Sequence, residues 1–226
     1  MTNIVYKTRD FVVVNKPSGI PSQADKSGDD DAMKQCAAAL SELGEKNELH
    51  IINRLDRVVG GLVLFARSRE SAATLSAMIS DDITKEYRAV VEGTPGEGVM
   101  KDFLYKDSIL GKSYVVKEPI GGAKEAELEY KTLETVEHNG KTLSLVSVKL
   151  KTGRFHQIRA QFSYRKMPLI GDKKYGSRDF TTNQPALFAT RLAFRYKSED
   201  IDVRANPDFT AYPWSLFEKK NIMRYL

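Results

Sequence analysis

The apolar positions of the first ninety or so residues occur in short runs that predict strands. Residues 11–17 read FVVVNKP, an apolar run that is ended by a proline. Residues 62–67 read LVLFAR, a continuous run of the kind found in strands that are buried on both faces. A third run, KEYRAVVEG at residues 85–93, closes with a glycine. We therefore predict three strands in this part of the chain.

Two segments between these strands have the periodicity of amphipathic helices. In residues 30–43 the apolar side chains recur at spacings of three and four, at Met33, Cys36, Leu40 and Leu43. The acidic run 29–31 would lie at the start of this helix, where the helix dipole favours negative charge. Ser68 is a suitable N-cap for the second helix, and an apolar stripe follows it at Ala72, Leu75, Ile79 and Ile83.

A β-hairpin is predicted around Asn139 and Gly140, because this pair accepts the positive φ angles of a tight turn. The flanking segments read EAELEYKTLE and KTLSLVSVKL. The apolar positions of the second segment change parity midway, which predicts a bulge near Val146 and Ser147. Beyond Gly153, the segment RFHQIRAQFSYRK predicts a helix.

Strands that come in hairpins, with a few helices between them, predict an α+β fold with a mainly antiparallel sheet. A strictly alternating parallel fold fits the pattern less well. No linker rich in Pro, Gly and Ser divides the 226 residues, and no repeat is visible. This length suits one substantial domain, or two small lobes that share a core.

Composition excludes several classes of protein. With 41% hydrophobic and 29% charged residues, the chain is neither disordered nor fibrous. The single cysteine, Cys36, excludes an internal disulfide and a multi-cysteine zinc site, and the three histidines form no short metal motif. No apolar stretch is long enough for a signal peptide or a membrane span, so we expect a cytoplasmic protein without a metal.

The net charge of +5 is unevenly distributed. Residues 149–178 contain nine basic side chains and one acidic one, Asp172. Such a basic segment indicates a polyanionic partner, although a solvated face would have the same composition. Within it, strand, glycine and helix follow one another at LKTGRFHQIR, where Arg154 lies beside an anion-friendly helix start. The alternative is an amphipathic helix with two exposed arginines.

A second candidate for chemistry is NRLDRVVGG at residues 53–61. Asp56 lies between Arg54 and Arg57, and a carboxylate beside positive charge stays ionised. Such a group can act as a nucleophile or as an electrostatic stabiliser. A surface salt bridge in a turn would have the same sequence. Gly60 and Gly61 permit a close backbone approach or a left-handed turn.

Taken together and in order, these segments resemble the RluA-type pseudouridine synthases. The similar segments are NKPSGIPSQ, NRLDRVVGGLVLFARS, KEYRAVVEG, TGRFHQIRAQFSYRKMPLIGDKKYG and ALFATRLAF. The resemblance extends from about residue 10 to about residue 194. It implies a pseudouridine synthase fold, in which a mixed, mainly antiparallel sheet is flanked by helices and the active-site cleft lies between two lobes. Residues 1–226 would then form a single catalytic domain.

The resemblance also implies roles for five residues. Asp56 matches the nucleophile of the family's RLD motif. Arg54 would enter the RNA stack in place of the extruded uridine, whose glycosidic bond is out of reach while it stays stacked. Tyr87 would stack on the uracil and help in proton abstraction. Arg159 would pair with Asp56, and Ile158 would form part of the apolar wall.

The implied reaction breaks the C1′–N1 bond and makes a C1′–C5 bond, so it requires no cofactor. A ribose adduct and a glycal intermediate both remain open as routes. RNA is the implied partner, ribosomal or transfer, and neither a membrane nor an obligate protein partner is expected. Within the basic segment, we expect Arg154, Lys173 and Lys174 to bind RNA.

The chain departs from the family at two places. The family usually has HRLD followed by Thr-Ser-Gly. In this chain Asn53 precedes RLD, and residues 58–61 read Val-Val-Gly-Gly. Since NKPSG begins at residue 15, no N-terminal S4-type RNA-binding domain is expected. The departures motivate a rival hypothesis, a non-catalytic RNA-binding or ribosome-assembly module with this fold. A phosphate-binding enzyme that uses a glycine pair is a weaker alternative, since neither pair has a GxGxxG or GKS context.

Overall fold

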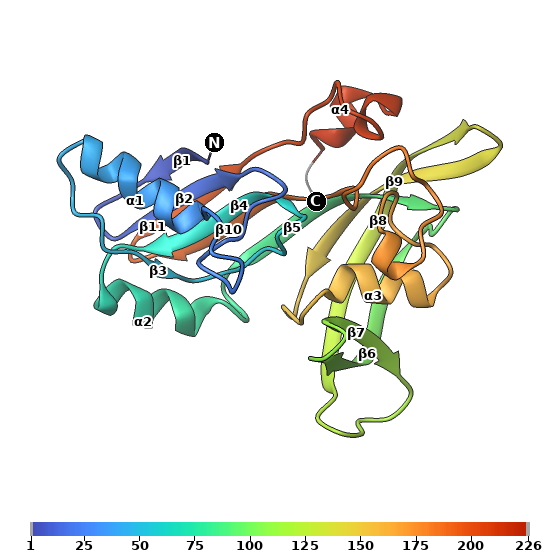
Figure 1. Ribbon diagram of the computed structural model, residues 1–226, viewed down its shortest axis with the longest axis horizontal. Helices are drawn as coiled ribbons and strands as arrows, with labels where there is room; N and C mark the ends of the chain where they lie inside the picture. The colour runs from blue at the N-terminus through green and yellow to red at the C-terminus, as the bar shows by residue number, and fades with distance from the viewer. Residues whose placement is uncertain (1, 225–226) are drawn as a thin grey trace. The chain divides into compact units, whose positions relative to one another are not determined.

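The computed structural model describes residues 2–224. Its contacts divide the chain into two compact units (Figure 1). The first unit comprises Met1–Thr84 and Ala189–Pro207, and the second comprises Lys85–Phe188 and Asp208–Leu226. Each unit combines antiparallel strand pairs with a few helices, which confirms the α+β fold class. The predicted cleft between two lobes and the single catalytic domain stay predictions.

The first unit is built on a sheet whose strands are ordered β1-β2-β4-β10, with β3 beside β4 and β11 beside β10. The strands are β1 (Asn3–Lys7), β2 (Phe11–Lys16), β3 (His50–Ile51), β4 (Gly60–Ala66), β10 (Leu187–Tyr196) and β11 (Glu199–Arg204). All seven residues of β4 are buried, so both faces of this strand are covered, as its continuous apolar sequence predicts. The strand predicted at residues 11–17 is confirmed as β2.

The glycine pair at the start of β4 permits close packing. Gly61 has φ of +117°, and a Cβ atom there would lie 2.3 Å from the carbonyl oxygen of Ala189. Only glycine fits this position without a shift of the backbone. The predicted close approach is therefore confirmed.

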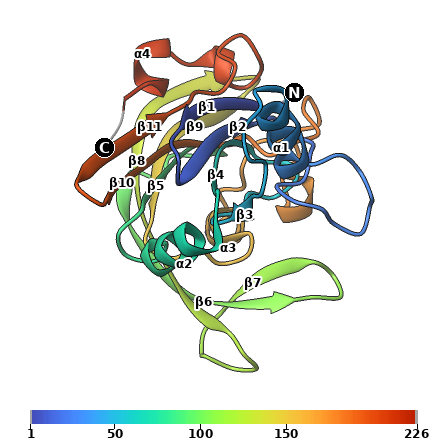
Figure 2. The same ribbon diagram turned by 90° about the vertical axis from the view of Figure 1, so that its left-hand side faces the viewer.

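Two helices pack on the sheet of the first unit (Figures 1 and 2). Helix α1 (Ala32–Glu42) contacts β2, and α2 (Arg69–Met78) contacts β3 and β4. Both predicted helix starts are confirmed. Asp31 accepts a hydrogen bond from the Lys34 N–H at 2.9 Å, and Ser68 accepts one from the Ser71 N–H at 3.1 Å.

The predicted apolar stripes extend further than the helices do. Cys36 and Leu40 of α1 are buried, but Leu43 is the C-cap and 63% exposed. Leu75 of α2 is buried, whereas Ile79 and Ile83 lie beyond the last helical residue, Met78. Ile83 is buried from the following connection. Periodicity therefore identified the core positions Cys36, Leu40 and Leu75 correctly but overestimated the lengths of both helices.

The second unit has an antiparallel sheet with the strand order β5-β9-β8-β6-β7. Its strands are β5 (Thr84–Glu92), β6 (Glu97–Asp107), β7 (Lys112–Val116), β8 (Lys124–His138) and β9 (Lys141–Leu150). The predicted strand at residues 85–93 is confirmed as β5. Asn139 and Gly140 have φ of 50° and 71° between the paired residues His138 and Lys141, which confirms the predicted hairpin turn.

The predicted bulge is on the wrong strand. The register shift lies between Thr132 and Glu134 of β8, opposite Val146 and Leu145 of β9. Residues 143–148 of β9 are buried without interruption. Because both faces of β9 are covered, its apolar side chains can change parity without an extra residue in that strand.

Helix α3 (Gln157–Tyr164) packs against β6, β7 and the short 3-10 helix η1 (Lys173–Tyr175). It is shorter than the predicted segment of residues 154–166, because His156 has φ of 52° and does not continue the helix. Ile158 and Phe162 are both buried, as their spacing predicts. The 3-10 helix η2 (Trp214–Leu216) and helix α4 (Lys219–Ile222) complete the unit, and Trp214 and Ile222 join the core around Val90 and Leu145.

Candidate active site

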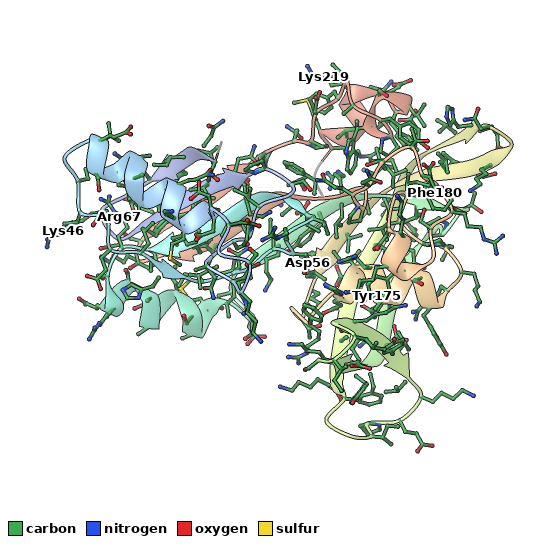
Figure 3. All side chains as sticks on the ribbon, in the orientation of Figure 1. Lys46, Asp56, Arg67, Tyr175, Phe180 and Lys219 are labelled. Atoms are coloured by element: carbon green, nitrogen blue, oxygen red, sulfur yellow. The ribbon has the colours of Figure 1, made fainter. Side chains whose placement is uncertain are left out.

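Asp56 lies in the loop between β3 and β4 of the first unit (Figure 3). The loop backbone is fixed by the buried Ser22, whose hydroxyl donates to the Leu55 carbonyl and accepts from the Leu55 N–H, each at 3.0 Å. The Val59 N–H donates to the Asp56 carbonyl at 3.0 Å and closes the turn. The sequence neighbours of Asp56 are therefore held, and the carboxylate itself is half-buried.

Lys16, the lysine of NKPSG, is fully buried beneath the same loop. Its ammonium donates to the carbonyls of Pro17 at 3.0 Å, Ile20 at 2.8 Å and Arg57 at 3.2 Å. Burial lowers the pKa of Lys16 to about 8, and the charge of Asp56 opposes part of that shift. A cation thus lies in the electrostatic field of the candidate nucleophile. Lys16 is not among the site residues predicted from the sequence, although a lysine that directly follows an apolar strand was a visible signal.

The predicted placement of Asp56 between two arginines stays a prediction, and Arg57 has further acidic partners. Its guanidinium turns to the acidic loop, where Nη1 lies 2.6 Å from Asp29 and Nη2 lies 3.4 Å from Asp25. These carboxylates are adjacent in space but 28 and 32 residues away in sequence. Arg54 is exposed. Lys16 is a further positive charge of this unit that is electrostatically coupled to Asp56.

Asn53 replaces the imidazole that the family pattern leads one to expect. Its amide oxygen accepts from the Leu64 N–H at 2.7 Å, and its amide nitrogen donates to the Leu62 carbonyl at 3.4 Å. Both partners belong to β4, so the Asn53 side chain connects the RLD segment to the buried strand by hydrogen bonds. The departure removes an imidazole but retains a buried, hydrogen-bonded support for the loop.

Arg159 lies on α3 of the second unit and is 4% exposed. Its Nε and Nη2 donate to the two carboxylate oxygens of Asp172 at 2.7 and 2.8 Å. This bidentate geometry fixes the plane of the guanidinium, and Asp172 is itself 1% exposed. The only acid of the basic segment is thus a structural partner of Arg159. The predicted pairing of Arg159 with Asp56 stays a prediction.

Tyr175 supports Arg159 from the other side, with its ring centroid 5.0 Å from the guanidinium carbon. The Tyr175 oxygen accepts from the Ser113 N–H at 2.7 Å and shares a hydrogen bond with His156 Nδ1 at 3.0 Å. Burial and the positive charges of Arg159 and Lys174 lower the pKa of His156 to about 3. His156 is therefore neutral at physiological pH.

The other predicted site residues are divided between the two units. Tyr87 is 7% exposed on β5, opposite Val148, and Ile158 is 4% exposed on α3. Both belong to the second unit together with Arg159, whereas Arg54 and Asp56 belong to the first. The RNA-binding candidates Arg154, Lys173 and Lys174 are exposed, as their role requires.

The predicted anion site at the start of α3 is partly occupied by the chain itself. The Arg154 N–H donates to Gln157 Oε1 at 3.0 Å, and Arg154 Nε donates to the Glu125 carbonyl at 2.7 Å. Thr152 Oγ1 also donates to Gln157 Oε1 at 2.8 Å. The Gln157 side chain therefore takes the place that an anion would have at the Arg154 amide.

Residues 2–224 contain no group of three His, Cys, Asp or Glu side chains that could hold a metal ion. Across the same residues, no helix has the length and apolar character needed to cross a membrane.

Comparison with known proteins finds matches in sequence and in fold. Residues 10–164 match the family described as RNA pseudouridylate synthase. A Vibrio cholerae protein named ribosomal large subunit pseudouridine synthase D is 31% identical over 182 residues, which are 78% of this chain and 53% of that protein. The tRNA pseudouridine synthase C of Vibrio parahaemolyticus is 30% identical over 243 residues, 93% of this chain and 95% of that protein. The chain thus spans about half the length of the first relative and nearly all of the second.

A solved structure titled human RNA pseudouridylate synthase domain containing 1 has the same fold. Its TM-score is 0.77 at 23% identity, and the match covers 95% of this chain and 86% of that one. The fold predicted from the resemblance is therefore confirmed. Because the family match covers more than half of the residues and includes the loop that carries Asp56, this chain belongs to the RNA pseudouridylate synthase family.

Proposed function

We propose that this protein converts uridine to pseudouridine within an RNA, with Asp56 as the nucleophile. The observation that carries the proposal is the RLD loop. In a chain of this family, Asp56 occupies a loop whose backbone is held by Ser22 and by the buried ammonium of Lys16. Relatives named as ribosomal and transfer RNA pseudouridine synthases support RNA as the substrate class.

The proposed chemistry requires an ionised carboxylate next to an extruded nucleotide. Asp56 either adds to the ribose at C1′ or drives elimination to a glycal, and the freed uracil rotates before C5 bonds to C1′. Arg54 takes the place of the extruded uridine in the stack, and Tyr87 contacts the uracil. Arg159 pairs with Asp56 and keeps it charged and oriented, a preorganisation of the kind that dominates many active sites. Ile158 contributes the apolar wall.

The reaction rearranges the bonds of one nucleotide and consumes nothing, so we propose that no cofactor takes part. We further propose that residues 1–226 act as one catalytic domain in the cytoplasm, without an obligate protein partner. RNA would be held by the exposed cations of the basic segment, Arg154, Lys173 and Lys174 among them. Ribosomal and transfer RNA both remain candidate substrates.

Asp56→Asn tests the nucleophile, because it conserves size and removes the charge. We expect the purified variant to form no pseudouridine in total ribosomal or transfer RNA, while its fold and RNA affinity stay close to wild type. Asp200→Asn, an exposed acid of β11, is the matched control and should retain full activity. Measurable turnover by Asp56→Asn would refute the proposed mechanism.

RNA that carries 5-fluorouridine separates the enzyme from its rival, a non-catalytic RNA-binding or ribosome-assembly module. Formation of the new C5 bond is normally followed by loss of the C5 proton, and fluorine cannot leave as a proton. The wild type should therefore yield a rearranged fluorinated base or a gel-stable complex, and Asp56→Ala should yield neither. Identical behaviour of the two proteins across ribosomal and transfer RNA would support the non-catalytic module.

A further inference from the structure

Phe180 lies in the segment between η1 and β10 of the second unit and is 70% exposed (Figure 3). A single exposed apolar side chain is common on protein surfaces and by itself indicates nothing. Three features of its surroundings make Phe180 different: an internally hydrogen-bonded loop, a cation above its ring, and the absence of a ring partner among the described residues 2–224.

The loop that carries Phe180 is held by its own side chains. Ser177 Oγ accepts from the N–H groups of Gly171 and Asp179, each at 3.2 Å. The Asp179 carboxylate accepts from the Thr181 N–H at 2.8 Å and from the hydroxyl of the half-buried Tyr212. Both neighbours of Phe180 in sequence are therefore fixed, so the exposed ring is presented by an ordered backbone. Little further entropy is lost when such a side chain binds a ligand.

The surroundings of the ring are cationic. The Lys173 ammonium lies 5.2 Å from the Phe180 ring centroid and is held there by the Asn183 side-chain oxygen at 2.6 Å. Lys174 and Arg178 are also exposed. The two acids of this stretch are engaged elsewhere, Asp172 by Arg159 and Asp179 by Tyr212. Asp179, directly next to Phe180, is half-buried, whereas the exposed ionic groups at Lys173, Lys174 and Arg178 are positive, which suits a polyanion.

Phe155, another exposed ring of the second unit, provides the contrast. It stacks on His156 with centroids 3.8 Å apart and an interplanar angle of 21°, and Lys106 lies 4.7 Å from its centroid. Its faces are thus engaged by the protein. Within residues 2–224 Phe180 makes no ring–ring contact, and only the Lys173 side chain lies over its ring.

We propose that Phe180 stacks on an unpaired nucleobase of the substrate RNA, while Lys173 and Arg178 contact the phosphates that flank this base. The inference rests on the proposed function and extends it to the substrate class: the bound RNA presents a single-stranded or loop nucleotide at this position. Proteins bind unpaired bases by combining aromatic stacking with cations along the backbone. Stacking is tolerant of sequence, so Phe180 would contribute affinity without selecting one base.

Stacking and phosphate contacts respond differently to salt, and this difference makes the proposal testable. Loss of a phosphate contact shallows the slope of log affinity against log salt, whereas loss of a stacking contact shifts the line without changing its slope. Phe180→Ala should therefore lower RNA affinity by about 5- to 150-fold at every salt concentration. Phe180→Tyr preserves the ring and should stay within about twofold of wild type, while Phe180→Leu preserves apolar character alone and should resemble Phe180→Ala.

The experiment measures binding of the full chain to total ribosomal RNA and, separately, to total transfer RNA over a range of salt. Ile109→Ala is the matched control, because Ile109 is a 97% exposed apolar residue of the β6–β7 connection. It should not change affinity. Lys173→Gln should shallow the slope by about one unit. Ultraviolet crosslinking of bound RNA, followed by mass spectrometry, should place a nucleobase adduct on the peptide that contains Phe180.

All variants are measured both alone and combined with Asp56→Asn, so that binding is separated from turnover. Equal affinity of wild type and Phe180→Ala for both RNA pools would overturn the inference. If Phe180→Ala weakens binding in parallel lines but the wild type makes no pseudouridine, the stacking contact stands and the proposed catalytic function fails. If turnover is present and affinity is unchanged, only the stacking inference fails.

Discussion

At the scale of single residues, buried charge is the feature that most distinguishes this chain. Lys16, Arg159 and Asp172 are each almost inaccessible, and each is surrounded by fixed partners. Burial of a charge is costly unless such partners are present, so removal of one partner leaves a large penalty. Two predictions follow from this balance.

Lys16 should make stability depend on pH in the alkaline range. Its pKa is about 8 in the folded protein, below the ordinary value of 10.5. Between these values the unfolded chain binds more protons than the folded one, so the free energy of unfolding should rise with pH by up to about 1.4 kcal/mol per unit. Below pH 8 Lys16 is charged in the folded and in the unfolded protein, so the full free-energy cost of burying its charge lowers stability.

Lys16→Met should remove this rise. Urea denaturation from pH 7 to 11 gives the free energy of unfolding of wild type and variant at each pH. The difference between the two isolates Lys16, since the other titrating groups are common to both proteins. Lys46→Met replaces an exposed lysine and should follow the wild-type curve. Parallel curves for wild type and Lys16→Met would show that Lys16 does not titrate in this window.

The Arg159–Asp172 pair should show strong coupling. Arg159→Met and Asp172→Asn should each lower the free energy of unfolding by about 3–5 kcal/mol, because each leaves the other group buried without this partner. The double variant should cost less than the sum of the two. Chemical denaturation of the four proteins gives the coupling energy, and strict additivity would argue against the pair as a unit.

At the scale of elements, the short helix α4 (Lys219–Ile222) depends on a contact far away in sequence. Arg88 of β5 is 0% exposed, and its Nε donates to the Ile222 carbonyl at 3.0 Å. Its Nη1 donates to Ser147 Oγ of β9 at 2.8 Å. A four-residue helix has little stability of its own, so tertiary contacts must hold it.

Arg88→Met should therefore destabilise the protein by about 2–4 kcal/mol, since it leaves the Ile222 carbonyl and Ser147 without this donor. Amide hydrogen exchange should accelerate first in residues 218–224. Arg195→Met, an exposed arginine of β10, serves as the control and should change stability by less than about 0.5 kcal/mol. Unchanged exchange at α4 would mean that core packing alone holds the helix.

At the scale of the whole molecule, the uneven distribution of charge should govern RNA affinity. Lys173 and Lys174 are exposed cations of the basic segment. Log affinity should fall linearly with log salt, because bound phosphates release counterions. Neutralising both lysines should shallow that slope by about one to two units. Filter binding over a range of salt measures this slope, with Lys46→Gln as the control. An unchanged slope in the double variant would place the RNA on another surface.

The sequence by itself determined the features that arise from neighbours along the chain. The buried strand at 62–67, the acidic run 29–31 at a helix start, the cap Ser68 and the turn at Asn139-Gly140 were all predicted correctly. Each depends on side chains within a few residues of one another, whose conformational preferences need no knowledge of the fold. The order of motifs likewise indicated the family, which the comparisons confirm.

Only the tertiary structure decided which groups hydrogen-bond or pair with the charged side chains. Lys16 meets the Arg57 carbonyl 41 residues away, Arg57 turns to Asp29 across 28 residues, and Arg159 meets Asp172 across 13. The position of the bulge also depends on the tertiary structure. It lies in β8, because both faces of its partner β9 are covered and the apolar side chains of β9 need no extra residue. Such partners are chosen by packing, because a buried charge or a shifted register is stable only where the fold brings complementary groups together.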